Sequence, residues 1–105
     1  MPQVILKNIS RESAAQLAPS VAEAVSRAIA LPMNHIVVEH SETEFFRGGK
    51  KDDHSAMVWI YWKKRTPEMQ KQVADALSEI LLTAGCHPVE IVYSNLDMND
   101  FYEYK

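Results

Sequence analysis

Apolar residues follow two periods along this chain. In four segments they alternate with their neighbours or form a short continuous run, which is typical of β-strands. Gln3 to Lys7 places Val4 and Leu6 on one side and Ile5 on the other. The same reasoning predicts further strands at residues 34–40, 57–62 and 89–94.

Two longer segments repeat their apolar residues at helical spacing. The first is predicted to begin after the N-cap Ser10 and to end at Leu31-Pro32, with Pro19 either in an early turn or at a kink. The second is capped by Thr66 and stops at Gly85. Shifting the first helix by about 52 positions superposes its apolar positions on those of the second.

The order of elements predicts an α/β (α+β) fold made of two βαβ repeats, about 1–50 and 54–105, within a single domain, 1–105. We expect a four-stranded mixed sheet with two helices on one face and a polar connection over residues 41–53. Residues 57–62 are apolar at every position, so both faces of that strand need cover. Because two helices cover one face only, we expect an oligomer in which sheet packs on sheet. A ferredoxin-like domain shares the order of elements but would pair the second and third strands as a hairpin.

The charge and the cysteine and histidine content limit the binding partners and the cellular compartment that we expect. The net charge is −3 and the pI about 5.7, with no basic block, which disfavours nucleic acid and membrane partners. The single cysteine, Cys86, fits a reducing compartment, and no signal segment is visible, so we expect a cytoplasmic protein. The four histidines lack zinc-ligand spacing, which argues against a metal site.

The feature of the sequence that most suggests catalysis is its Met1-Pro2 start. Removal of Met1 would leave Pro2 as a secondary amine at the end of a strand. A free α-amino group titrates near ~8, and burial or nearby cations lower that value. Pro2 is therefore a candidate general base near neutral pH.

Three features together carry a resemblance: the Met1-Pro2 start, the βαβ repeat and the loop Phe46-Arg47-Gly48-Gly49. With the run from Val92 to Asn99, they make the chain resemble the tautomerase superfamily, which includes 4-oxalocrotonate tautomerase and macrophage migration inhibitory factor. It is also similar to a bacterial tautomerase-like family without an assigned function. The resemblance implies a tautomerase fold, a homotrimer with active sites between subunits, no cofactor, and keto–enol isomerisation of a small oxo-acid.

The resemblance also implies roles for individual residues. Pro2 would be the catalytic base, Arg11 would bind the substrate carboxylate, and the substrate pocket would include Phe46, Tyr93 and Asn95. One expected pocket cation is missing here: Val37 stands where short tautomerases have a second arginine, and Leu31 where the migration inhibitory factor has a lysine. Candidates to replace it are Arg47, Lys50 and Arg65, although Arg65 is more simply interpreted as a solvated residue. The alternative to an isomerase is a non-catalytic oligomeric binding or interaction protein that keeps the fold.

Overall fold

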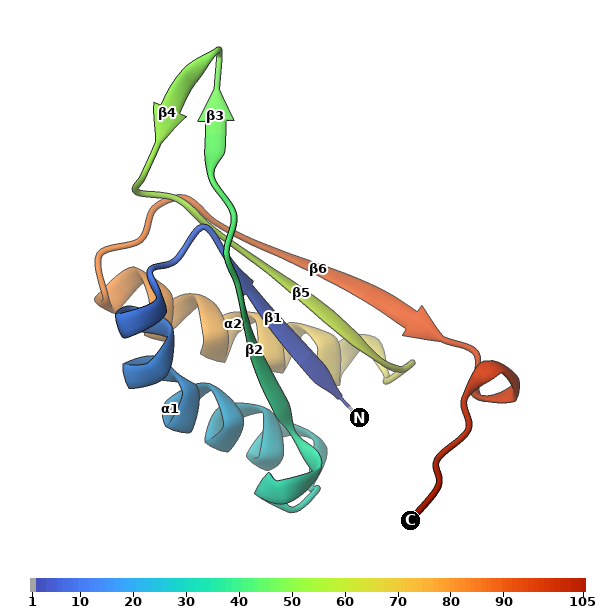
Figure 1. Ribbon diagram of the computed structural model, residues 1–105. Helices are drawn as coiled ribbons and strands as arrows, with labels where there is room; N and C mark the ends of the chain where they lie inside the picture. Colours follow the sequence, from blue (N-terminus) through green and yellow to red (C-terminus); the bar gives the residue numbers. More distant parts are fainter. Residues whose placement is uncertain (1) are drawn as a thin grey trace.

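Strand β5 (Ala56–Lys63) is an inner strand of the sheet, and the alternation of its side chains separates the two faces of the sheet. Ala56, Val58, Ile60 and Trp62 are fully buried, whereas the residues between them are only half-buried. The computed structural model describes residues 2–105 of the chain, and Figure 1 shows both long helices on the face that carries the buried set. β5 therefore has one covered face, as expected, and one that the chain's own helices leave open.

The sheet order is β2-β1-β5-β6, with β1 (Gln3–Lys7), β2 (Val37–Ser41) and β6 (Val89–Leu96) beside β5. β1 pairs in parallel with β2, β5 pairs in parallel with β6, and β1 and β5 run antiparallel at the centre. This arrangement confirms the mixed sheet and the two βαβ units. It excludes the ferredoxin-like alternative, because the second and third predicted strands are not neighbours.

Helices α1 (Arg11–Ile29) and α2 (Pro67–Thr83) start as the sequence predicts. The Ser10 hydroxyl accepts a hydrogen bond from the Ser13 N–H (3.1 Å), and the Thr66 hydroxyl accepts one from the Met69 N–H (3.2 Å). Each such cap contributes about 1 kcal/mol. α2 ends with Gly85 at φ +96°, where the Cys86 N–H bonds the Leu81 carbonyl in the pattern of a Schellman motif.

Pro19 falls in the middle of α1 rather than in an early turn, and the helix continues through it. The missing N–H removes the partner of the Ala15 carbonyl. Both residues are exposed, so water can bond that carbonyl. α1 ends at Ile29, earlier than predicted, because Ala30 adopts the left-handed conformation (φ 55°).

Three boundaries differ from the sequence prediction. The second strand begins at Val37 because residues 34–35 belong to a 3₁₀ turn, η1 (Met33–His35), that follows Pro32. The third and fourth strands are longer than predicted, reaching Lys63 and Leu96.

The polar connection predicted over residues 41–53 contains secondary structure that the sequence analysis did not predict. It contains a hairpin of β3 (Phe45–Arg47) and β4 (Lys50–Asp52) that projects from the body of the molecule (Figure 1). Gly48 and Gly49 join the two strands with φ of +59° and +79°, the conformation that two-residue hairpin turns require. A short 3₁₀ turn, η2 (Met98–Asp100), and the C-terminal segment follow β6.

Candidate functional site

Pro2 lies at the end of the sheet where β1 begins. Pro2 is buried, and its carbonyl accepts a hydrogen bond from the Val37 N–H of β2 (3.0 Å), so its backbone continues the pairing of β1 with β2. Gln3 pairs with Tyr61 in the antiparallel register of β1 and β5, and the next pair along would be Pro2 and Trp62. Trp62 in turn pairs with Asn95 on β6. Met1, whose removal the proline-base hypothesis requires, lies outside the described residues.

Trp62 contacts two other side chains at the Pro2 end of the sheet. Its ring stacks on Tyr93 with centroids 4.7 Å apart at 11°, and the Arg65 guanidinium carbon lies 5.5 Å from the Trp62 ring centroid. The indole is fully buried, and its Nε1–H has no hydrogen-bond partner among the described residues. Such a buried unpaired donor is uncommon in folded proteins.

Tyr93 points toward α2 rather than away from the helices. Its hydroxyl donates to the Gln70 carbonyl, and burial raises the pKa of Tyr93 to about 12. The residues of β6 that pair with the open side of β5 are instead Glu90, Val92, Ser94 and Leu96. The Tyr93 hydroxyl is therefore already engaged within its own subunit.

Arg11 and Phe46 lie at the other end of the sheet. Five strand residues separate Pro2 from the far end of β1, which at ~3.3 Å per residue is roughly 16 Å. Arg11 is exposed at the start of α1 with its guanidinium 3.7 Å from Glu42, and Phe46 is 64% exposed on the hairpin. Within one subunit, neither residue can meet a substrate held at Pro2.

A cavity of about 670 Å³ adjoins Arg11. Its lining is mixed in charge: Arg11 faces Glu42, and Lys51 lies 3.7 Å from Glu44. Glu12 and Asp53 add further negative charge. Because its cations already have carboxylate neighbours, this cavity offers no free cation to an acidic ligand.

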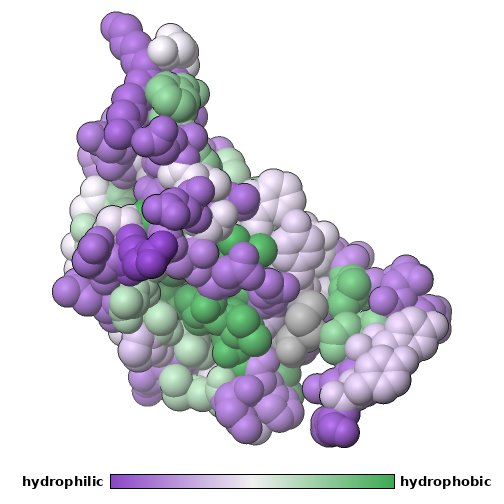
Figure 2. All heavy atoms as spheres, in the orientation of Figure 1, coloured by the Kyte–Doolittle hydropathy of each residue, from purple (hydrophilic) through white to green (hydrophobic). Residues whose placement is uncertain are grey.

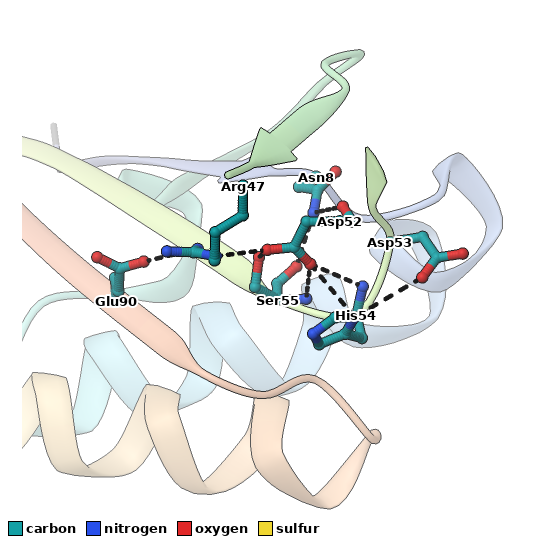
Figure 3. A network of polar contacts seen from close by, with 7 residues as sticks. All are labelled: Asn8, Arg47, Asp52, Asp53, His54, Ser55 and Glu90. Atoms are coloured by element: carbon teal, nitrogen blue, oxygen red, sulfur yellow. Dashed lines mark hydrogen bonds and ion pairs between the residues drawn. The ribbon is translucent and has the colours of Figure 1, made fainter. Parts of the chain in front are cut away.

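Asp52 anchors the hairpin to the body (Figure 3). Its carboxylate is 2% exposed and accepts hydrogen bonds from the Arg47 Nε (2.8 Å), the Ser55 hydroxyl (2.7 Å) and backbone N–H groups of residues 54 and 55. The Arg47 guanidinium holds the pKa of Asp52 well below its usual range, with help from Ser55. The Asn8 side chain bonds the Asp52 and Ser55 carbonyls, and Arg47 also reaches Glu90 (3.3 Å). All these donors and acceptors satisfy one another.

The open face of the sheet is apolar at its centre. Met57, Trp59 and Tyr61 of β5 alternate with the buried residues and are half-buried, with the Trp59 and Tyr61 rings 6.3 Å apart. In Figure 2 apolar side chains reach the surface in the middle of the view, whereas the projecting hairpin at the top is mostly hydrophilic.

The structure thus brings three of the five predicted site residues, Pro2, Tyr93 and Asn95, to one end of the sheet and leaves Arg11 and Phe46 at the other. Of the three candidate replacement cations, Arg47 and Lys50 belong to the hairpin, and only Arg65 lies at the Pro2 end. Sequence reasoning treated Trp62 only as part of the apolar strand 57–62 and did not single out Asp52. Within residues 2–105, no group of three His, Cys, Asp or Glu side chains could hold a metal ion.

Comparison with known proteins places this geometry in a family. A model described as "Domain of unknown function (DUF1904)" matches residues 1–105. The chain belongs to the DUF1904 family. A crystal structure of a DUF1904 domain from Sebaldella termitidis is similar, with 25% identity, a TM-score of 0.89, and coverage of 98% of this chain and 95% of that one. The search of curated proteins found no match.

Two further solved structures share the fold of this DUF1904 chain. A fused 4-OT, solved as an asymmetric trimer, is 19% identical with a TM-score of 0.82, covering 97% of this chain and 92% of that one. A macrophage migration inhibitory factor from Toxoplasma gondii is 18% identical with a TM-score of 0.71, covering 97% and 96%. The predicted resemblance and fold are confirmed: this is a tautomerase fold. No helix in the described part of the chain is long and apolar enough to cross a bilayer.

Proposed function

We propose that this protein is a keto–enol isomerase of small oxo-acids, with Pro2 as its general base. The observation that carries the proposal is the position of Pro2, buried at the start of β1, one residue beyond the Gln3–Tyr61 pair and at the end of the sheet where Arg65 lies over Trp62. Once Met1 is removed, Pro2 carries a secondary amine. Burial and a nearby guanidinium both disfavour the protonated amine and lower its pKa toward neutrality.

The isomerisation moves one proton within the substrate, and the Pro2 amine that carries this proton ends the reaction in the protonation state in which it began. In ketonisation, the Pro2 nitrogen removes the proton from the enol hydroxyl, the double bond shifts to form the carbonyl, and the proton is delivered to the adjacent carbon. Donors near the oxygen stabilise the negative charge that develops there. The working form in this proposal is a cytoplasmic homotrimer, in which the open apolar face of each sheet is covered by the other subunits. A fused 4-OT of the same fold was solved as a trimer, which supports this assembly.

The test is ketonisation of phenylenolpyruvate and 2-hydroxymuconate by tag-free protein whose loss of Met1 is established by mass spectrometry. Two matched forms serve as controls: Pro2→Ala, and a form that retains Met1. In the latter the Pro2 nitrogen is an amide and cannot accept a proton. We expect turnover in the processed wild type only. Equal rates in all three forms would refute the role of Pro2.

A second candidate is a non-catalytic oligomeric binding protein. It is favoured by the engagement of the Tyr93 hydroxyl with Gln70 and by the distance between Arg11 and Pro2 within one subunit. This alternative predicts no turnover with either substrate although the assembly is intact.

A further inference from the structure

Three consecutive cations, Lys63, Lys64 and Arg65, lie where β5 ends, at the sheet end that holds Pro2. None of the three forms an ion pair with a carboxylate of residues 2–105. The other arginines all do: Arg11 with Glu42, Arg27 with Glu23, and Arg47 with Asp52 and Glu90. Arg65 is thus the one arginine of four whose charge is left uncompensated by the described chain.

Arg65 is nevertheless held in place. Its guanidinium lies over the Trp62 ring, and one terminal nitrogen donates to the Lys63 carbonyl. Trp62 is fixed in turn by its stacking on Tyr93, whose hydroxyl is tied to α2 through Gln70. An arginine ordered in this way loses little conformational freedom when it binds a ligand. Most of its five N–H donors stay available for a planar acceptor such as a carboxylate.

The neighbouring groups are donors as well. The buried Trp62 Nε1–H has no acceptor in the described part of the chain, and the exposed Asn95 pairs with Trp62 across the strands. The nearest acid in sequence, Glu68, forms no ion pair with the cations among residues 2–105. Asp97, just after β6, accepts a hydrogen bond from the Asn99 N–H. An end of the sheet that presents unpaired donors and an uncompensated guanidinium favours an anionic ligand.

We propose that Arg65 binds the carboxylate of the ligand at the Pro2 end of the sheet, in the role that sequence resemblance gave to Arg11. This deepens the proposed function, since it makes the substrate a carboxylic acid held by the same subunit that supplies the base. Binding through Arg65 does not itself require a basic Pro2, so the two proposals can fail separately.

The test measures anion preference at equilibrium. Cinnamate and its neutral analogue cinnamamide are titrated calorimetrically into processed wild type, Pro2→Ala, Arg65→Gln, Arg65→Lys and Arg11→Gln proteins. Arg27→Gln, an exposed arginine on α1, is the matched neutral control. We expect the preference for cinnamate to fall about 10- to 100-fold in Arg65→Gln, as loss of a charge-assisted pair predicts, and only partly in Arg65→Lys. Thermal melts check that each variant is folded.

Several outcomes decide the matter. Unchanged preference in a folded Arg65→Gln protein, or no cinnamate binding to wild type, overturns the proposal. A loss in both Arg65→Gln and Arg11→Gln supports it and shows that a second subunit adds Arg11. Arg65-dependent binding without turnover leaves this inference standing and refutes the isomerase. If turnover is present, the loss in Arg65→Gln should raise KM for phenylenolpyruvate, whereas Arg27→Gln keeps wild-type kinetics.

Discussion

Replacement of Trp59 by lysine should dissociate the proposed trimer while leaving the subunit folded. Trp59 lies on the open face of β5, stacked on Tyr61 and with its Nε1 donating to the Met57 sulfur (3.2 Å). It faces away from both helices, so the change spares the core between sheet and helices. In a trimer that buries this face, the side chain would sit at the centre of the contact between sheets.

The expected loss of trimer stability follows from the three-fold repetition of the contact. Truncating a buried tryptophan at an interface typically costs about 2 kcal/mol or more, and a trimer contains three copies, so the loss is about 6 kcal/mol per trimer. At ~1.4 kcal/mol per factor of ten, the trimer dissociation constant rises about 10⁴-fold. Because that constant carries the square of a concentration, the midpoint of dissociation should shift by roughly 100-fold.

Sedimentation velocity over a range of protein concentrations measures this midpoint. Leu82→Lys is the matched control, because Leu82 is 52% exposed on α2, on the opposite side of the sheet. We expect Leu82→Lys to sediment like wild type at every concentration. A Trp59→Lys protein that remains trimeric with the wild-type midpoint, or a wild type that is monomeric throughout, would refute the reasoning that the open face is the interface.

Three further predictions concern the subunit itself. The pKa of Asp52 is lowered in the folded state, so its ionised form stabilises the fold above the unfolded pKa of about 4, and this stability is lost as pH falls through the folded pKa. Asp52→Asn should therefore weaken the fall in unfolding free energy at acid pH, measured by urea unfolding. An unchanged pH dependence would contradict the Arg47 anchor. Tyr93→Phe removes the hydrogen bond to Gln70 and should cost about 1 kcal/mol of unfolding free energy. In wild type the ultraviolet titration of Tyr93 should occur only near pH 12, and a tyrosine complement that titrates entirely near its ordinary value would argue against this burial. Leu77→Ala should lower the unfolding free energy by about 2–5 kcal/mol, because Leu77 is fully buried between α2 and the sheet. Thermal or chemical unfolding measures this loss. A loss below about 1 kcal/mol would mean that the core collapses around the smaller side chain.

Local patterns were sufficient for much of this fold. β1 has the predicted bounds because its alternation is flanked by polar residues, and both helices begin at the predicted caps because Ser10 and Thr66 act on neighbours three residues away. The hairpin escaped prediction because each of its strands has only three residues. Its Gly48-Gly49 pair is nevertheless a known signal for a two-residue turn.

Contacts between distant residues were beyond sequence reasoning. Asn8 bonds Asp52 across 44 positions, and Arg47 reaches Glu90 across 43, so no spacing rule marks Asp52 as buried and ionised. Register decided the candidate site in the same way. Strand alternation aims Tyr93 at α2, where its hydroxyl bonds Gln70, and a shift of one residue is enough to exchange the two faces of a strand. Its place in a substrate pocket stays a prediction.

The two repeats give the sheet two comparable ends, and their polar groups are used differently. Where β5 begins, Asp52, Arg47, Ser55 and Asn8 satisfy one another and hold the hairpin, so this end has few donors to offer a ligand. Where β1 begins, the Trp62 N–H has no acceptor and Arg65 has no carboxylate partner among residues 2–105. Buried or ordered donors left unpaired lower stability unless a ligand or water pairs them. These unpaired groups support the proposed carboxylate ligand at that end, beside Pro2.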